Sequence, residues 1–432
     1  MKKVNQIFVI IFIALIFVLF LAILSGKIFS RQIAELNKKS STSNSDTVNI
    51  DWEKQYPYDI SVKTDGVPKY NTGKEVSTIT KLADKISQFG NLGNTLATSM
   101  FKYKEISQSA NIINSKLTDI SIAGNYTRLK NGYWVSTENT KKELESAENI
   151  LSNYYYLQEY LKSEGIDFMY CYAPVKECKA DDQLPDGVTS YTNTNIDTYI
   201  EGLKSLNINY IDLREKLHED GLEHYSLFYK TDPHWNIDGG FWAASVIERE
   251  LNENFNLDME NVSQVGAFYR KTYENAVFGS AGQAVTHFNV QSENFDILFP
   301  NFETNFSLEI PDKNIYATGS FEDVFINYDG LNAVIEEGGG YAYEQILYGN
   351  RPYEKIINLN NPNGLKILMI RDSFSIAVAP YLACSCSELV LLDTRSENGN
   401  FTGSVVSCIN QFKPDIVLAL QSKPQTLTLN KE

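Results

Sequence analysis

The strongest constraint on the fold is the alternation of apolar runs with helical patterns near the end of the chain. Buried-type strand patterns occur at 366–370, 389–392 and 416–420, and helical patterns at 375–382 and 401–412 separate them. A strand–helix–strand–helix–strand order predicts a parallel sheet that helices cover on both faces. The predicted fold class is therefore α/β.

The same alternation begins earlier in the chain. The candidate elements there are helices at 140–164, 195–205 and 237–251 and strands at 166–172 and 208–213. Residues 290–350 differ, because short aromatic and β-branched stretches alternate with turn residues. That composition predicts a β-rich insertion, less tied to the alternating pattern.

The amino terminus predicts a membrane anchor. Residues 7–24 form an unbroken apolar run, close to the ~20 residues that span a bilayer, and two lysines precede it. On this basis we expect a single-pass protein with an anchor at 1–26, a stalk or linker at 27–74 and an extracytoplasmic catalytic domain at 75–432. A cleaved signal peptide is the alternative, and it also places the domain outside the cytoplasm.

The charge and the metal-binding residue types exclude some partners. The formal net charge is -16 and the pI is about 4.9. These values argue against nucleic acid as a partner, because contacts to phosphate require a basic stripe. No cluster of His, Cys and Asp has the spacing of metal ligands in the sequence, so neither a metal nor another cofactor is expected.

A serine lies where an α/β fold places catalytic nucleophiles. Asp372 and Ser373 follow the predicted strand 366–370 and open the next helix. Sites form at the carboxyl ends of parallel strands, and the N–H of Ser373 near a helix start can stabilise an oxyanion. The alternative is that Asp372 and Ser373 only cap the helix.

A histidine and an aspartate provide the partners that a nucleophilic serine requires. Asp232 and His234 are separated only by Pro233, and Trp235 follows. A serine nucleophile needs a base, and a histidine base needs a carboxylate that fixes its tautomer. The alternative is that the Asp232-Pro233 pair only starts a turn and that Trp235 packs in the core.

These two motifs belong to an ordered series. The series consists of Asp51-Trp52 with Tyr56-Pro57, Asn131-Gly132-Tyr133-Trp134, Ala173-Pro174-Val175-Lys176 with Leu184-Pro185, Thr231-Asp232-Pro233-His234-Trp235, Tyr348-Gly349-Asn350-Arg351-Pro352, Asp372-Ser373-Phe374 and Asp393-Thr394-Arg395. In order and rough spacing it resembles the SGNH-hydrolase-like family of bacterial polysaccharide O-acetyltransferases, which includes the alginate O-acetyltransferases. Within that family it looks most similar to the DHHW-protein branch.

The resemblance implies a role for each matched residue. Ser373 matches the nucleophile, His234 the general base and Asp232 the partner that orients the base. The weaker candidates, for substrate or oxyanion binding, are Arg395, Asp372 and Trp235.

The chain also departs from the family pattern. Arg371 stands where the family commonly has glycine, and Pro233 stands where the DHHW label has its second histidine. A small residue is favoured before Asp372 if the backbone turns tightly there, so Arg371 puts the local backbone in question. Because Asp232 and His234 precede the serine, the resemblance implies a permuted SGNH-like parallel sheet flanked by helices.

The function that the resemblance implies is extracytoplasmic O-acyl transfer, expected to be O-acetyl transfer, to a secreted or cell-wall polysaccharide through an acyl-serine. In this family a membrane-bound O-acyltransferase hands over the acyl group, so the expected partners are that protein, the polysaccharide and the membrane. Two alternatives remain: a carbohydrate esterase that uses the same triad, and a non-catalytic polysaccharide-binding or assembly protein.

Overall fold

The structure is a computed structural model that describes residues 122–123, 125–260, 262–264, 266–285, 290–395 and 403–429. The predicted anchor and stalk, and the start of the predicted catalytic domain, lie outside these residues. All the described residues belong to one compact unit. No helix within these ranges has both the length and the apolar character that crossing a bilayer requires.

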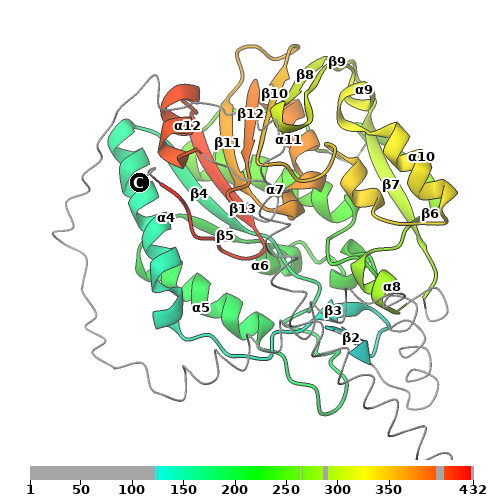
Figure 1. The fold of residues 1–432 in the computed structure, drawn as a ribbon. Helices are drawn as coiled ribbons and strands as arrows, with labels where there is room; N and C mark the ends of the chain where they lie inside the picture. The colour runs from blue at the N-terminus through cyan, green and yellow to red at the C-terminus, as the bar shows by residue number, and fades with distance from the viewer. Residues whose placement is uncertain are drawn as a thin grey trace, which may run out of the picture. The chain divides into compact units, whose positions relative to one another are not determined.

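An eight-stranded sheet forms the centre of the fold, with the strand order β5-β4-β13-β11-β12-β10-β8-β9. The first five strands in this order are parallel, and they are β5 (Tyr210–Asp212), β4 (Asp167–Tyr172), β13 (Ile416–Gln421), β11 (Lys366–Arg371) and β12 (Glu388–Leu392). The antiparallel edge consists of β10 (Tyr353–Asn358), β8 (Phe306–Ile310) and β9 (Ile315–Gly319). The predicted α/β fold with a mostly parallel sheet is confirmed (Figure 1).

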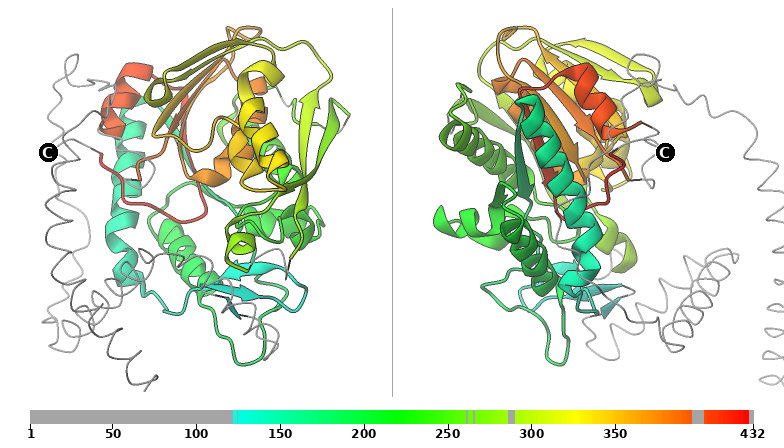
Figure 2. Two further views of the ribbon diagram at one scale, coloured as in Figure 1. Left: turned by 45° about the vertical axis from the view of Figure 1, so that its right-hand side comes forward. Right: turned by 90° about the vertical axis from the view of Figure 1, so that its left-hand side faces the viewer.

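Helices cover both faces of the sheet. Successive residues of a strand point to opposite faces, and so they belong to two different hydrophobic cores. In β13, Val417 and Ala419 join the core under α4 (Leu144–Glu164), α5 (Thr192–Ser205) and α12 (Val405–Phe412). Leu418 and Leu420 join the core under α6 (Leu213–Glu219), α7 (Ile237–Phe255) and α11 (Ala379–Ser385). Figure 2 shows α4 and α12 side by side on one face, where the Tyr160 hydroxyl donates to Asn410 Oδ1 at 2.6 Å.

Smaller elements surround the carboxyl-end edge of the parallel strands. They are the small sheet β1 (Ile122–Ala123), β2 (Tyr126–Arg128) and β3 (Trp134–Ser136), the ribbon β6 (Phe268–Val277) and β7 (Glu293–Pro300), and α8 (Ser280–Val285). Short 3-10 helices occur at η2 (His224–Leu227), η3 (Pro311–Lys313), η4 (Ala342–Gln345) and η5 (Ser373–Ala377). Two of these, η4 and η5, lie at the candidate site described below.

The predicted β-rich insertion at 290–350 is only partly correct. Strands are present, but β8 and β9 extend the main sheet, and β7 pairs with β6, which begins before the predicted segment. The segment also contains two helices, α9 (Phe321–Phe325) and α10 (Tyr328–Glu336). A capping box between Ser320 and Asp323 starts α9, and this local signal outweighs the β propensity of the aromatic residues that follow.

The predicted helix at 375–382 is divided in two. η5 ends at Ala377, and α11 begins at Ala379 with Pro380 in its first turn. Proline has no N–H to donate, so it suits the start of a helix and not its interior. The division leaves η5 as a short separate turn that carries Ser373.

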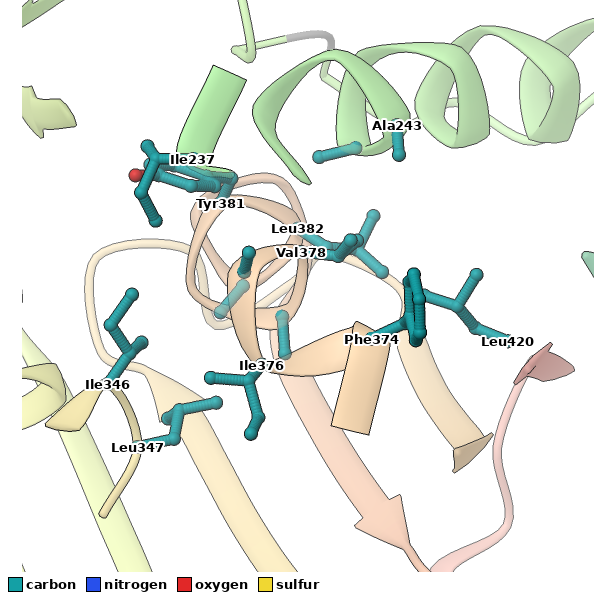
Figure 3. Packing of buried hydrophobic residues seen from close by; sticks show 14 of the residues in the cluster. Ile237, Ala243, Ile346, Leu347, Phe374, Ile376, Val378, Tyr381, Leu382 and Leu420 are labelled. Carbon is teal, nitrogen blue, oxygen red and sulfur yellow. The ribbon is translucent and has the colours of Figure 1, made fainter. Parts of the chain in front are cut away.

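Close packing joins the two segments that carry the predicted catalytic residues. A Cβ added at Gly240 in α7 would lie 2.4 Å from the Cβ and the carbonyl oxygen of Ala377, so only glycine permits this approach. Ile237 and Ala243 of α7 face Val378 and the start of α11 (Figure 3). This contact places the amino end of α7, which follows His234, beside η5.

A buried carboxyl group in the core should make stability depend on pH. Glu248 of α7 is fully buried, accepts hydrogen bonds from the Ser263 and Ser385 hydroxyls, and burial raises its pKa to about 7. A raised pKa gives stability that is complete below the unfolded value of 4.5 and is lost as the pH rises through 7. From this group we expect a loss of about 3 kcal/mol between pH 4.5 and pH 8.

The Glu248→Gln variant tests this expectation by thermal unfolding over the same pH range. The amide does not titrate, so the difference in stability between wild type and variant should change across this range. Parallel pH curves for the two proteins would contradict the assignment to Glu248.

Candidate active site

Ser373 lies at the carboxyl-end edge of the parallel sheet. β11 ends at Arg371, and η5 begins two residues later at Ser373. The Ser373 side chain is partly exposed between buried neighbours. A serine in this position is accessible to a substrate while its backbone is held by the sheet.

His234 reaches Ser373 from the segment before α7. Trp235 pairs with Phe228 in an isolated β-bridge, and Asn236 caps α7 by accepting from the Gly239 N–H at 3.1 Å. These contacts on its carboxyl side fix the backbone at His234. The imidazole Nε2 then lies 2.7 Å from Ser373 Oγ.

Asp232 completes the arrangement on the other side of the imidazole. Its Oδ1 lies 2.6 Å from His234 Nδ1 and also accepts from the His234 backbone N–H at 3.0 Å. The Asp232 carboxylate is buried, whereas the His234 side chain remains 14% exposed. The three residue types are therefore in series at hydrogen-bond distance, as nucleophilic catalysis requires.

The environment keeps Asp232 ionised. Burial alone raises the pKa of its carboxyl group, but the charge of His234, the two hydrogen bonds from His234 and the charge of Lys176 outweigh burial and lower the pKa below 3.8. An ionised Asp232 accepts the Nδ1 proton, which leaves Nε2 to accept the Ser373 proton.

A comparison with known protein families identifies the fold type. Residues 133–284 match the family model described as an SGNH hydrolase-like domain, acetyltransferase AlgX. The match covers about a third of the chain, and it includes Asp232 and His234 but not Ser373. It confirms over this range the resemblance expected from the sequence.

Solved structures share the fold over a larger part of the chain. Bacillus cereus PatB1 is 20% identical, with a TM-score of 0.56 over 67% of this chain and 93% of PatB1. PatB1 with a sulfonyl adduct gives 19% identity and a TM-score of 0.59 over 71% and 100% of the two chains. A DHHW family protein from Eubacterium siraeum is 17% identical, with a TM-score of 0.49 over 67% and 87%. PatB1 shares the fold of this chain, and no curated protein matches the chain.

Asp372, predicted as a weak binding candidate of the SGNH-like domain, has a structural role. Its Oδ1 accepts from the Phe374 N–H at 2.9 Å, and its Oδ2 accepts from the N–H and hydroxyl of Ser422 at 2.7 and 2.8 Å. The side chain therefore caps η5 and ties it to the end of β13, which is the capping alternative. A carboxylate with these partners is not suited to bind an oxyanion.

Trp235 also has a packing role. The indole is 1% exposed, its Nε1 donates to the Phe374 carbonyl oxygen at 2.9 Å, and its ring meets the Phe374 ring edge-on at 5.4 Å. These contacts lock the histidine segment onto η5. These contacts are those of the packing alternative, and a role of Trp235 in substrate or oxyanion binding stays a prediction.

Arg395 lies at the same edge of the sheet, just beyond β12. Its guanidinium forms a two-pronged ion pair with Asp393, with Nε–Oδ1 and Nη2–Oδ2 distances of 3.0 and 2.7 Å. Asp393 is buried and also accepts from Asn350. The hydrogen bond from Asn350 to Asp393 joins two motifs of the series, 348–352 and 393–395. The role of Arg395 in binding stays a prediction.

Arg371 does not distort the turn before Ser373. It ends β11, it is not among the described residues with positive φ, and Asp372 has an extended backbone with φ of -120° and ψ of -170°. Its side chain leaves the site and pairs with Glu354 of β10, and both side chains are fully buried. Glycine is therefore not required at position 371 in this chain.

Tyr343 is a site residue that the sequence did not reveal. Its ring in η4 stacks against the His234 imidazole with centroids 4.4 Å apart and planes 9° apart. Its hydroxyl donates toward the carbonyl oxygens of Ser373 and Phe374, at 3.0 and 3.1 Å, and lies 3.3 Å from the Ala377 N–H. Tyr343 thus holds the base and the nucleophile segment at once, although no pattern in residues 290–350 singles it out.

One backbone donor near the nucleophile is available. Among the described residues, the Ser373 N–H has no hydrogen-bond partner. A free N–H beside Oγ can donate to an oxyanion that forms on an acyl carbon attached there.

The described part of the chain contains no group of three or more His, Cys, Asp or Glu residues that could hold a metal ion.

Proposed function

We propose that this protein is an extracytoplasmic O-acetyltransferase that modifies a secreted or cell-wall polysaccharide through an acyl-serine intermediate. The observation that carries the proposal is the series Asp232–His234–Ser373, with contacts of 2.6 and 2.7 Å, in a chain that matches an acetyltransferase domain over residues 133–284. The order of these residues along the chain fits a permuted form of the SGNH-like sheet.

The first half of the reaction forms the acyl-serine. His234 Nε2 takes the proton of Ser373 Oγ as the oxygen attacks the acyl carbon of the donor. The Ser373 N–H stabilises the oxyanion, and Asp232 stabilises the imidazolium. Collapse of the tetrahedral intermediate breaks the bond to the donor oxygen, which receives the proton from His234.

The second half transfers the acyl group. His234 takes a proton from a sugar hydroxyl, the sugar oxygen attacks the acyl carbon, and the bond to Ser373 Oγ breaks. The proton then returns to Ser373, and the enzyme is regenerated. The acyl donor outside the membrane would come from a membrane-bound O-acyltransferase, and the apolar run at 7–24 would keep this protein beside it.

The test uses the full-length protein in detergent with a chromogenic acetyl ester. We expect acetyl-ester turnover and an acetyl adduct on Ser373 by intact mass, and the Ser373→Ala variant should lose turnover by about 1,000-fold or more, together with the adduct. Ser205→Ala, at an exposed serine of α5, is the matched control.

Added glycans then separate transfer from hydrolysis. Acetate on the glycan supports the transferase, whereas release of acetate to water alone supports an esterase. Unchanged turnover in a folded Ser373→Ala protein would exclude the proposed nucleophile. A folded wild type with neither turnover nor adduct would favour the non-catalytic binding protein.

A further inference from the structure

A buried lysine lies behind the triad. Lys176, beyond the end of β4, is 3% exposed, and its Nζ donates to the carbonyl oxygens of Trp134 and Lys230 at 2.8 and 3.2 Å. An ammonium group is costly to bury unless hydrogen bonds and opposite charges compensate it. The residues around Lys176 must therefore compensate its buried charge.

The Glu293 carboxylate binds the same peptide segment through its N–H groups. Glu293 of β7 accepts from the N–H groups of Lys230 and Thr231 at 2.7 and 3.0 Å and from the Thr231 hydroxyl at 3.0 Å. Lys176 holds the carbonyl of Lys230, so Lys230 is held at both its N–H and its C=O. Asp232 follows directly, which makes this segment the support of the triad.

Gly279, between β6 and α8, also contacts the segment. The Gly279 N–H donates to Thr231 Oγ1 at 3.2 Å, and a Cβ at Gly279 would lie 2.4 Å from Asp232 Cα. Backbone therefore packs directly against Asp232 on this side. The position of Asp232 is determined by contacts from three separate parts of the chain.

Two carboxylates, Asp232 and Glu293, are the charged groups that act on Lys176. Burial lowers the pKa of Lys176 to about 8, and Asp232 and Glu293 oppose that shift. His224 contacts the carbonyl oxygens of Val175 and Lys176 through Nε2, and burial lowers its pKa, so it is uncharged at neutral pH. Near neutral pH the Lys176 ammonium thus interacts with two carboxylates, one of which is the triad's own.

We propose that Lys176 and Glu293 are positioning residues that form a charged clamp on the segment 230–232, and that the Lys176 ammonium stabilises the Asp232 carboxylate. This inference rests on the proposed function, because it assigns the clamp to the same triad. The clamp holds Asp232 at its distance from His234 and keeps it ionised when the imidazole becomes charged. Neither residue contacts the reacting atoms.

The experiment measures the rate at which phenylmethylsulfonyl fluoride labels Ser373 in the full-length protein, by intact mass, between pH 5 and pH 9. Lys176→Met removes a positive charge and should move the acidic limb of the rate profile to higher pH by about one unit. Glu293→Gln removes a negative charge and should move the same limb to lower pH. Both variants should also lower the plateau rate by about 10- to 100-fold, because the segment is less well held.

The direction of these shifts separates the clamp from simple loosening of the structure. Loosening lowers both plateaus without opposite shifts, so that result would overturn the proposal. Lys179→Met, at an exposed lysine that pairs with Asp197, is the matched control and should leave the profile unchanged. If Lys176→Met does not fold, the shift in the nearly isosteric Glu293→Gln decides.

Failure of the wild-type control has a different meaning. A wild type that is not labelled at Ser373 would overturn the nucleophile itself, and with it both the proposed function and the clamp. A wild type labelled at Ser373, with profiles that do not move in the two variants, would overturn the clamp alone.

Discussion

Replacing Asp232 with asparagine should lower acetyl-ester turnover by about 10,000-fold while the protein stays folded. The carboxylate accepts the Nδ1 proton of His234 at 2.6 Å, and this fixes Nε2 as the acceptor for Ser373. An amide can present its NH₂ group to Nδ1, which favours the tautomer with the proton on Nε2. In that tautomer His234 cannot take the Ser373 proton.

The measurement is kcat/KM for the acetyl ester, with thermal unfolding as the check on folding. Asp238→Asn makes the same substitution six residues later, at a side chain in the first turn of α7 that is 43% exposed and pairs with Arg270, and it should change kcat/KM little. A folded Asp232→Asn protein that retains turnover within about tenfold of wild type would show that His234 acts without this carboxylate.

The parallel half of the fold could be predicted because its local and long-range signals agree. The strand predicted at 366–370 contains the uninterrupted apolar run 367–370, and in the structure these residues of β11 are buried with a parallel neighbour on each side. The segment 290–350 could not be predicted in the same way, since aromatic runs such as that around Phe321 and Phe325 suit a strand or a buried helix. Tertiary contacts and the cap at Ser320 decide between them.

Prediction from the sequence reached the same limit at the candidate active site. Asp232, His234 and Ser373 could be proposed because their residue types have complementary chemistry and their motifs resemble a family. Tyr343 and Glu293 could not, because their roles exist only as contacts to residues far away in the sequence, such as the stacking of Tyr343 on His234. Sequence reasoning also placed Asp372 and Trp235 among the binding candidates, whereas the structure shows that each holds η5 in place.

Replacing Glu354 with alanine should destabilise the protein by about 3–5 kcal/mol, the largest effect on stability that we expect. Glu354 and Arg371 pair through Nη2 with both side chains at 0% exposure, and the Arg371 Nε and Nη1 atoms have no hydrogen-bond partner among the described residues. Without Glu354, the guanidinium is left with the Arg351 carbonyl oxygen at 3.1 Å. The free energy of unfolding in denaturant at pH 8 measures this, since burial raises the pKa of Glu354 and alkaline pH keeps it ionised.

Two further variants distinguish a buried unpaired charge from the loss of an ordinary contact. Glu388→Ala removes a carboxylate of β12 that is 25% exposed and pairs with Lys355, and it should cost about 1 kcal/mol or less. Equal losses for Glu354→Ala and Glu388→Ala would contradict the buried-charge argument.

The double variant Arg371→Met, Glu354→Leu removes both buried charges and should recover most of the stability that Glu354→Ala loses, because an apolar pair of similar volume needs no compensating charge. Acetyl-ester turnover should also persist in this variant, since the Arg371 backbone leads into Ser373 whereas its side chain points away from the triad. Loss of turnover in a stable double variant would instead assign the guanidinium a part in holding η5.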